Sequence, residues 1–153
     1  MRKYYEALLE QFRELHQEIQ KALEVLPIEA LDWVPGPEMN SISVLTVHLA
    51  GAERYWVGDV VRGDPSFRNR EAEFQVKGMD NAALKQRLAD LDAYEATTLE
   101  KLRLRDLDQV RVSPRDGRTV TVAWALLHAM EHTAVHVGHI EILVQQWKQR
   151  QAG

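Results

Sequence analysis

Apolar residues recur every three or four positions in four separate stretches of the chain, which is the spacing of helices that bury one face. Residues 2–26 form the first stretch, and Pro27 ends it because proline cannot continue a helix. The second runs from Asn40 or Ser41, either of which can cap a helix, to about Arg62. The third covers residues 80–105, and the fourth runs from Thr119 or Thr121 to about Lys148. This pattern predicts an all-α fold, a single four-helix bundle.

The connections between these stretches differ in character. Residues 27–40 contain three prolines and one glycine, which exclude a long helix. Residues 63–79 make a connection longer than usual between neighbouring helices, so it can cross the bundle and allow parallel second and third helices. The pattern leaves that connectivity open. Polar and apolar residues alternate around Asp116-Gly117, which predicts a short hairpin before the fourth helix. The polar tail, residues 149–153, is expected to fray.

Composition narrows the class of protein. With 153 residues, 45% hydrophobic and 27% charged, the chain suits one globular domain spanning residues 1–153. A net charge of −4 without a basic cluster argues against nucleic-acid binding. No run of eighteen apolar residues predicts a membrane span, and the charged N-terminus is unlike a signal peptide. The absence of cysteine excludes disulfides and thiolate ligands and fits a cytoplasmic protein.

Four of the six histidines lie between His128 and His139, inside the fourth helix. At ~100° per residue, His132 and His136 fall within the apolar stripe, whereas His128 and His139 lie on its edge beside Glu131. One turn separates His132 from His136, so both imidazoles can reach one metal ion. The alternative is a pair of core histidines that hydrogen bond to the backbone or to each other.

His48 lies in the apolar stripe of the second helix, together with Leu45, Ala52 and Trp56. A third inward histidine on a separate helix favours a shared site over two structural residues. Three neutral imidazoles suit Zn²⁺, Ni²⁺, Fe²⁺ or Mn²⁺ and leave coordination positions open for water or substrate. The sequence therefore predicts a metal centre at His48, His132 and His136.

Three other polar positions have two interpretations each. Glu95 occupies a seam position of the third helix, either as a metal ligand or partner of one, or because the seam drifts to Tyr94 and Leu99. His128 and His139 either orient the ligand rings or are polar groups at a helix border. His16 lies next to the seam of the first helix.

Two segments resemble the DinB/YfiT-like superfamily: the helix start Asn40-Ser41-Ile42 followed by His48-Leu-Ala-Gly-Ala-Glu-Arg-Tyr-Trp56, and residues 128–140, His-Ala-Met-Glu-His-Thr-Ala-Val-His-Val-Gly-His-Ile. The resemblance covers nearly the whole chain. It implies a four-helix bundle, often dimeric, with a divalent metal on His48, His132 and His136. Gly138 matches a family glycine and is expected to permit close helix approach. Val137 and His139 depart from the Arg and Gln common in the family.

The resemblance also implies possible activities. Relatives include S-transferases that use the thiols bacillithiol or mycothiol, a mycothiol-dependent maleylpyruvate isomerase, and suspected hydrolases. The first hypothesis is a metal-dependent S-transferase that joins a low-molecular-weight thiol to an electrophilic small molecule. The second is a hydrolase that uses metal-bound water. The third is a non-catalytic metal-binding homodimer, because Trp124, Val135 and Ile142 form a second apolar line that could pack on another helix or subunit.

Overall fold

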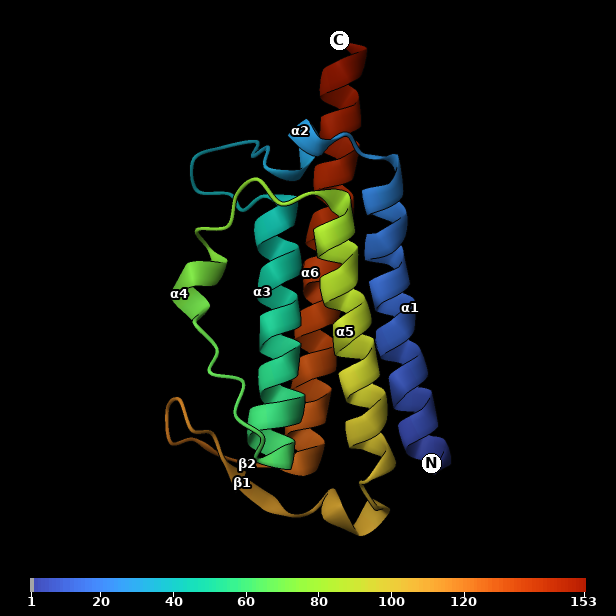
Figure 1. Cartoon of the computed structure of the whole chain (residues 1–153), viewed down its shortest axis with the longest axis vertical. Helices are drawn as coiled ribbons and strands as arrows, with labels where there is room; N and C mark the ends of the chain where they lie inside the picture. The colour runs from blue at the N-terminus through green and yellow to red at the C-terminus, as the bar shows by residue number, and fades with distance from the viewer. Residues whose placement is uncertain (1) are drawn as a thin grey trace.

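Four long helices lie side by side and form a bundle (Figure 1). The computed structural model describes residues 2–153, and its long helices are α1 (Lys3–Val25), α3 (Ile42–Arg54), α5 (Asn81–Glu100) and α6 (Val122–Ala152). A π-helical segment, η1 (Tyr55–Arg62), continues α3 to the predicted end of the second helix. The predicted all-α bundle is therefore confirmed. No helix within residues 2–153 has the length and apolar character needed to cross a membrane.

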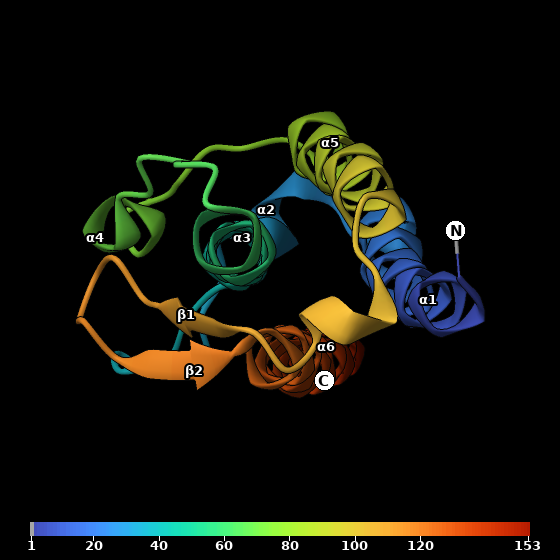
Figure 2. The ribbon, with the colours of Figure 1, turned by 90° about the horizontal axis from the view of Figure 1, so that it is seen from below.

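The order of the helices around the bundle is α1, α5, α3 and α6, and each packs against its two neighbours in this ring (Figure 2). α3 and α5 run in the same direction, whereas α1 and α6 run in the opposite one (Figure 1). The segment between α3 and α5 returns along the outside of the bundle and carries the short helix α4 (Arg70–Glu73) beside α3. The long connection thus makes the second and third long helices parallel.

The remaining elements are short. α2 (Ile28–Leu31) lies at one end of the bundle, and η2 (Leu104–Asp106) is a 3-10 turn that follows α5. β1 (Val110–Val112) and β2 (Thr119–Thr121) form the predicted antiparallel hairpin, with Arg111 opposite Val120. Gly117 lies in its turn with a φ of 71°, a left-handed conformation that glycine adopts without strain.

Two predicted helix ends were wrong. α5 ends at Glu100 and not at residue 105, because the chain turns into η2, where the Asp106 carboxylate accepts a hydrogen bond from the Arg103 N–H at 2.7 Å. α6 continues to Ala152, beyond the predicted end near Lys148, and the Gln, Lys and Arg residues of this segment are good helix formers. The N-caps Ser41 and Thr121 are each among the predicted alternatives.

The buried face of α6 matches the predicted stripe only in part. Thr133 and Val137 are buried in the bundle, whereas His132 and His136 are only half-buried. The prediction placed His132 and His136 within the stripe. In the structure α6 packs on both α1 and α3, so the histidines flank the central seam on the α3 side.

Two apolar clusters fill the bundle, and one polar layer separates them. One cluster contains Ile19, Leu49, Leu88 and Ile140, and the other contains Phe12, Trp56, Leu99 and Leu126. Between them along the chain lie buried polar residues from all four long helices, among them His16, Glu53, Glu95 and Thr133.

Candidate metal centre

His48 lies in α3, whose N-terminus is defined by a side-chain cap. The Ser41 hydroxyl accepts a hydrogen bond from the Val44 N–H at 3.2 Å and caps α3. Residues 41–50 are all buried, so α3 presents apolar residues on nearly every side. His48 is 6% exposed within this helix and faces α6. A polar ring at such a position requires partners.

The three predicted ligands converge. The ring centroid of His48 lies 5.0 Å from that of His132 and 5.1 Å from that of His136. The Nε2 atoms of His132 and His136 are 3.2 Å apart. One nitrogen of each of the three rings lies within 4.8 Å of the others. The structure thus brings together His48 and His132, which lie 84 positions apart in the sequence.

Glu73, on α4, orients the His48 ring. Its Oε2 accepts a hydrogen bond from Nδ1 of His48 at 2.9 Å. A carboxylate only accepts, so Nδ1 carries the proton and Nε2 keeps its lone pair. Arg68 donates to both oxygens of Glu73, at 2.6 and 2.8 Å, and this bidentate pair fixes the carboxylate. A carboxylate behind a histidine is the usual support of a metal-ligating imidazole.

The electrostatics keep the other two rings neutral. Burial, followed by the neighbouring His136 and His48, lowers the pKa of His132 to about 3. Burial, followed by His48 and His139, lowers the pKa of His136 to about 4. Burial alone would raise the pKa of Glu73, but the hydrogen bonds from Arg68 and His48 outweigh it and the pKa is lowered. The ionised carboxylate and neutral imidazoles are the forms that metal binding requires.

The donor set fits a divalent transition metal. Two nitrogens that each lie 2.0–2.1 Å from a tetrahedral zinc ion are about 3.3 Å apart, close to the 3.2 Å between the Nε2 atoms of His132 and His136. These two rings are half-buried, so the side of the centre away from His48 reaches the surface. Three imidazoles with an accessible side have the composition of a catalytic site, whereas structural zinc sites use four protein ligands.

The neighbouring histidines have different surroundings. Nδ1 of His139 lies 3.3 Å from Nδ1 of His136, so His139 is placed to orient that ligand ring. His128 stacks on Trp124 with centroids 4.7 Å apart, and Nδ1 lies 3.7 Å from a Glu131 oxygen. His128 is therefore part of an aromatic cluster with Trp124 and Trp56, at the border of the site.

The sequence interpretation missed the contribution of residues 63–79. It treated Glu73 as part of a loop, although the apolar Phe74 beside it was a signal that this segment packs. The Phe74 ring lies 4.7 Å from the His48 ring and covers it. Gly51 was quoted only as part of a motif, but a Cβ there would overlap the Glu73 carboxylate. Gly138, expected to permit close helix approach, has no neighbouring atom within 4 Å of a would-be Cβ, so that expectation was wrong.

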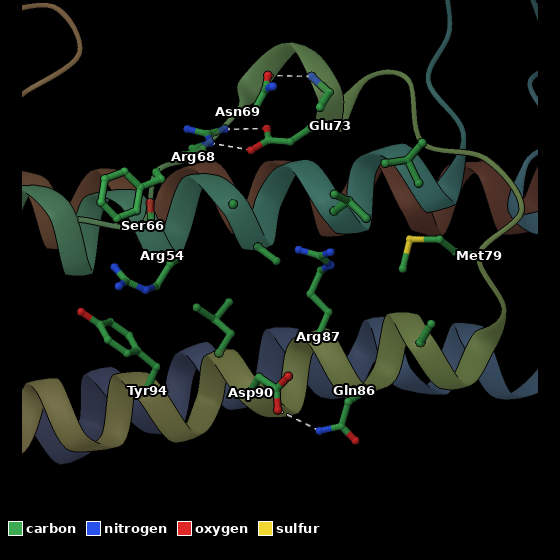
Figure 3. Close-up of a pocket in the computed structure, with 18 residues that line it drawn as sticks. Arg54, Ser66, Arg68, Asn69, Glu73, Met79, Gln86, Arg87, Asp90 and Tyr94 are labelled. Atoms are coloured by element: carbon green, nitrogen blue, oxygen red, sulfur yellow. Dashed lines mark hydrogen bonds and ion pairs between the residues drawn. The ribbon is translucent and has the colours of Figure 1, made fainter. Parts of the chain in front are cut away.

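A cleft of about 950 Å³ opens on the other side of the Arg68–Glu73 pair (Figure 3). α3, α5 and the segment that carries α4 form its walls, with Arg54, Arg87 and Tyr94 among the lining residues. None of the three histidines lines it. The ion pair therefore separates this cleft from the metal centre.

The bundle has the fold of solved DinB-like proteins and of YfiT. Residues 1–152 match the family described as "Protein of unknown function (DUF1572)", and the chain belongs to this family. No curated protein matches the sequence.

Solved structures share the fold at low sequence identity. YfiT from Bacillus subtilis, described as a probable metal-dependent hydrolase with an unusual four-helix bundle topology, is 17% identical with a TM-score of 0.76, covering 97% of this chain and 90% of its own. A DinB-like protein from Bacillus cereus is 18% identical with a TM-score of 0.75, covering 94% and 92%. A mycothiol-dependent maleylpyruvate isomerase is 16% identical with a TM-score of 0.64, covering 87% of this chain but only 59% of the isomerase.

Proposed function

We propose that the protein is a divalent-metal-dependent enzyme whose metal is held by His48, His132 and His136. The observation that carries this proposal is the convergence of three rings, one of them oriented by the Glu73 carboxylate at 2.9 Å. A structural histidine pair would not need a carboxylate fixed in turn by a bidentate arginine. When bound, a divalent cation supplies the positive charge that ionises a coordinated thiol or water near neutral pH.

The residues around the centre have distinct tasks in this proposal. Glu73 and Arg68 hold the proton on Nδ1 of His48 and so fix the ring orientation. His139 positions the ring of His136 from the exposed side. Phe74 covers His48 and excludes water from the buried side. The half-buried rings of His132 and His136 leave the other side accessible to a small molecule.

Within this class, we favour an S-transferase that uses a low-molecular-weight thiol. The chain contains no cysteine, so a thiolate at the centre must come from a small molecule. One protein of the same fold is described as a mycothiol-dependent isomerase, which supports a thiol co-substrate. The thiol sulfur forms a bond to an electrophilic carbon, the leaving group departs with the electrons of the broken bond, and the thiol proton passes to solvent.

Hydrolysis is the second candidate. The description of YfiT as a probable metal-dependent hydrolase favours it, because a centre with three protein ligands also has room for water. A single comparison separates the two reactions. The tag-free protein, loaded with Zn²⁺, Mn²⁺, Fe²⁺ or Ni²⁺, is incubated with a panel of alkylating electrophiles and esters, with and without bacillithiol, mycothiol or glutathione.

The outcomes of this experiment are distinct. Electrophile consumption that requires a thiol and yields a thioether identifies the S-transferase. Turnover that is indifferent to thiol identifies the hydrolase. The His132→Ala variant should lose either activity by more than about a hundredfold, as expected when a metal ligand is removed. If chelation lowers the melting temperature but no thiol or electrophile reacts, the non-catalytic metal-binding bundle is the correct description.

A further inference from the structure

The polar layer in the middle of the bundle is a second cluster of metal-ligating residues, separate from the three-histidine centre. His16 on α1, Glu53 on α3 and Glu95 on α5 are each 0% exposed. A ring nitrogen of His16 and one carboxylate oxygen of each glutamate all lie within 4.8 Å of one another. Apolar side chains lie above and below the layer, so these charges have no access to water. Such a cluster is costly to bury unless something satisfies it.

Two ligand atoms of this cluster accept no hydrogen bond. They are the carboxylate oxygens of Glu95, and both are buried. Nε2 of His16 and Oε1 of Glu53 lie 3.0 Å apart as a buried ion pair. Two nitrogen or oxygen ligands of one cation are about this far apart at metal–ligand distances of 2.0–2.2 Å. The atoms therefore converge on a common point between the three helices.

His16 is supported in the same way as His48. Nδ1 of His16 lies 2.7 Å from a carboxylate oxygen of Asp92, one turn before Glu95 on α5. If Nδ1 donates to Asp92, Nε2 presents its lone pair to the cluster. The other oxygen of Glu53 is also fixed, because the Thr133 hydroxyl on α6 donates to Oε2 at 2.5 Å. All four long helices thus contribute either a ligand atom or the group that orients one.

The electrostatics of the cluster favour the binding of an additional positive charge. Burial raises the pKa of Glu95 well above its ordinary value, and the neighbouring Glu53 raises it further. Burial would lower the pKa of His16, but Glu53 and Asp92 outweigh it and raise the pKa to about 9. Protons can supply this charge in the metal-free protein. A proton on Glu95 can be shared with Glu53, whereas a cation bound by both oxygens of Glu95 would replace that proton and satisfy both oxygens.

We propose that His16, Glu53 and Glu95 bind a second divalent cation in the bundle core. One imidazole and two carboxylates are a harder donor set than three imidazoles, so the cation is of the Mn²⁺ or Fe²⁺ class. Because the ligands are wholly buried on three different helices, this ion is a structural cross-link and not a substrate-binding centre. The site shares no ligand with His48, His132 and His136 and does not depend on the proposed enzymatic activity.

The test uses full-length, tag-free protein stripped with a chelator and titrated with Mn²⁺. Free Mn²⁺ is followed by electron paramagnetic resonance, and bound metal by elemental analysis after gel filtration. The His132→Ala/His136→Ala double variant removes the first centre and leaves the core untouched. It should bind one Mn²⁺ per chain and melt at a higher temperature with Mn²⁺ than without. A folded double variant that binds no Mn²⁺ would overturn the proposal and identify the cluster as a proton-sharing network.

The Glu95→Gln variant tests the ligand assignment. It should weaken Mn²⁺ binding to the core by at least about tenfold while the first centre keeps its metal. The matched control is Asp90→Asn, which removes an exposed carboxylate from the same helix and should keep both sites. Wild-type core affinity in Glu95→Gln would contradict the assignment. If Glu95→Gln does not fold, the His132→Ala/His136→Ala variant alone decides, because its core residues are unchanged.

Discussion

Glu73 accepts a hydrogen bond from His48 across 25 positions of sequence, from a single helical turn that lies outside the bundle. The bond fixes which nitrogen of His48 faces the other two histidines. The candidate metal centre thus draws on two helices and one outlying turn, and substitutions in this turn should weaken metal binding without unfolding the bundle.

Glu73→Gln should lower metal affinity at the three-histidine centre by about 10- to 100-fold, the usual effect of losing a carboxylate behind a ligating histidine. The neutral amide no longer holds the proton on Nδ1 of His48 as firmly, and Arg68 loses its bidentate partner. Competition titration with a chromophoric zinc chelator measures the change. Glu71→Gln on the same turn is the control, because Glu71 is exposed and should leave the affinity unchanged.

Gly51→Ala should weaken metal binding by an indirect route. The new methyl group would overlap the Glu73 carboxylate and displace it from His48. The same zinc titration should show a loss comparable to that of Glu73→Gln, and a Gly51→Ala/Glu73→Gln double variant should lose little more than either single variant. Gly138→Ala, where a Cβ has open space, should keep metal affinity and raise helix stability by about 0.5–1 kcal/mol. Additive losses in the double variant would refute the coupling.

Removal of the metal from the three-histidine centre should lower thermal stability. A ligand that binds only the folded state stabilises it by about 2.7 kcal/mol at one hundred times its dissociation constant. For a chain of this size that corresponds to about 5–10 °C in melting temperature. Differential scanning calorimetry with Zn²⁺ and with chelator measures the shift. The difference between wild type and His132→Ala/His136→Ala isolates the contribution of this centre, and an equal shift in both would contradict it.

The turn of the β1–β2 hairpin should show a measurable pH dependence. The Ser113 side chain and the Arg118 N–H hydrogen bond to Asp116, and together with Arg115 they lower its pKa from 3.8 to about 2. Because the folded-state pKa is the lower one, the contribution is fully present above about pH 4 and is lost as the pH falls through about 2. A carboxyl carbon NMR titration of Asp116 should give that midpoint. In Asp116→Asn, the hairpin should lose this part of its pH dependence.

The family resemblance predicts a homodimer, and one exposed apolar face of α6 is a candidate for its interface. Trp124, Leu127, Val135 and Ile142 are exposed along one side of this helix. If a second copy covers this face, Val135→Glu/Ile142→Glu should convert a dimer into a monomer in light scattering coupled to gel filtration. Glu141→Gln, at an exposed position beside Ile142, is the control. A wild-type protein that elutes as a monomer at all concentrations contradicts the expectation.

Periodicity was sufficient to predict the architecture but not the exact buried faces. The four long helices, the hairpin at Asp116-Gly117 and the long second connection follow from local spacing and turn residues. The exact buried face of α6 does not follow from local spacing. His132 and Thr133 are adjacent, and only packing against α1 and α3 decides which of them is central. Likewise, the sequence analysis treated burial of Glu95 and a seam that drifts to Leu99 as alternatives. In the structure both residues are buried.

The convergence of His48, His132 and His136 could be predicted because each lies in a strongly periodic helix. The role of Glu73 could not be predicted, because no local sequence pattern indicates that residue 73 contacts His48. The core cluster was hidden for a related reason. His16, Glu53 and Glu95 are each a single polar residue in an apolar stripe, and only the three-dimensional arrangement shows that they occupy the same level of the bundle.

The parallel course of α3 and α5 has a consequence for how this chain reaches its native state. A misfolded bundle with antiparallel neighbours could still bring His48, His132 and His136 together, because these residues belong to α3 and α6 alone. It would not deliver Glu73, which arrives only when the crossing segment passes along the correct side of α3. If the proposed metal binds at these histidines, its full affinity requires the native course of the segment that carries Glu73, and a bundle closed by another route would bind it weakly.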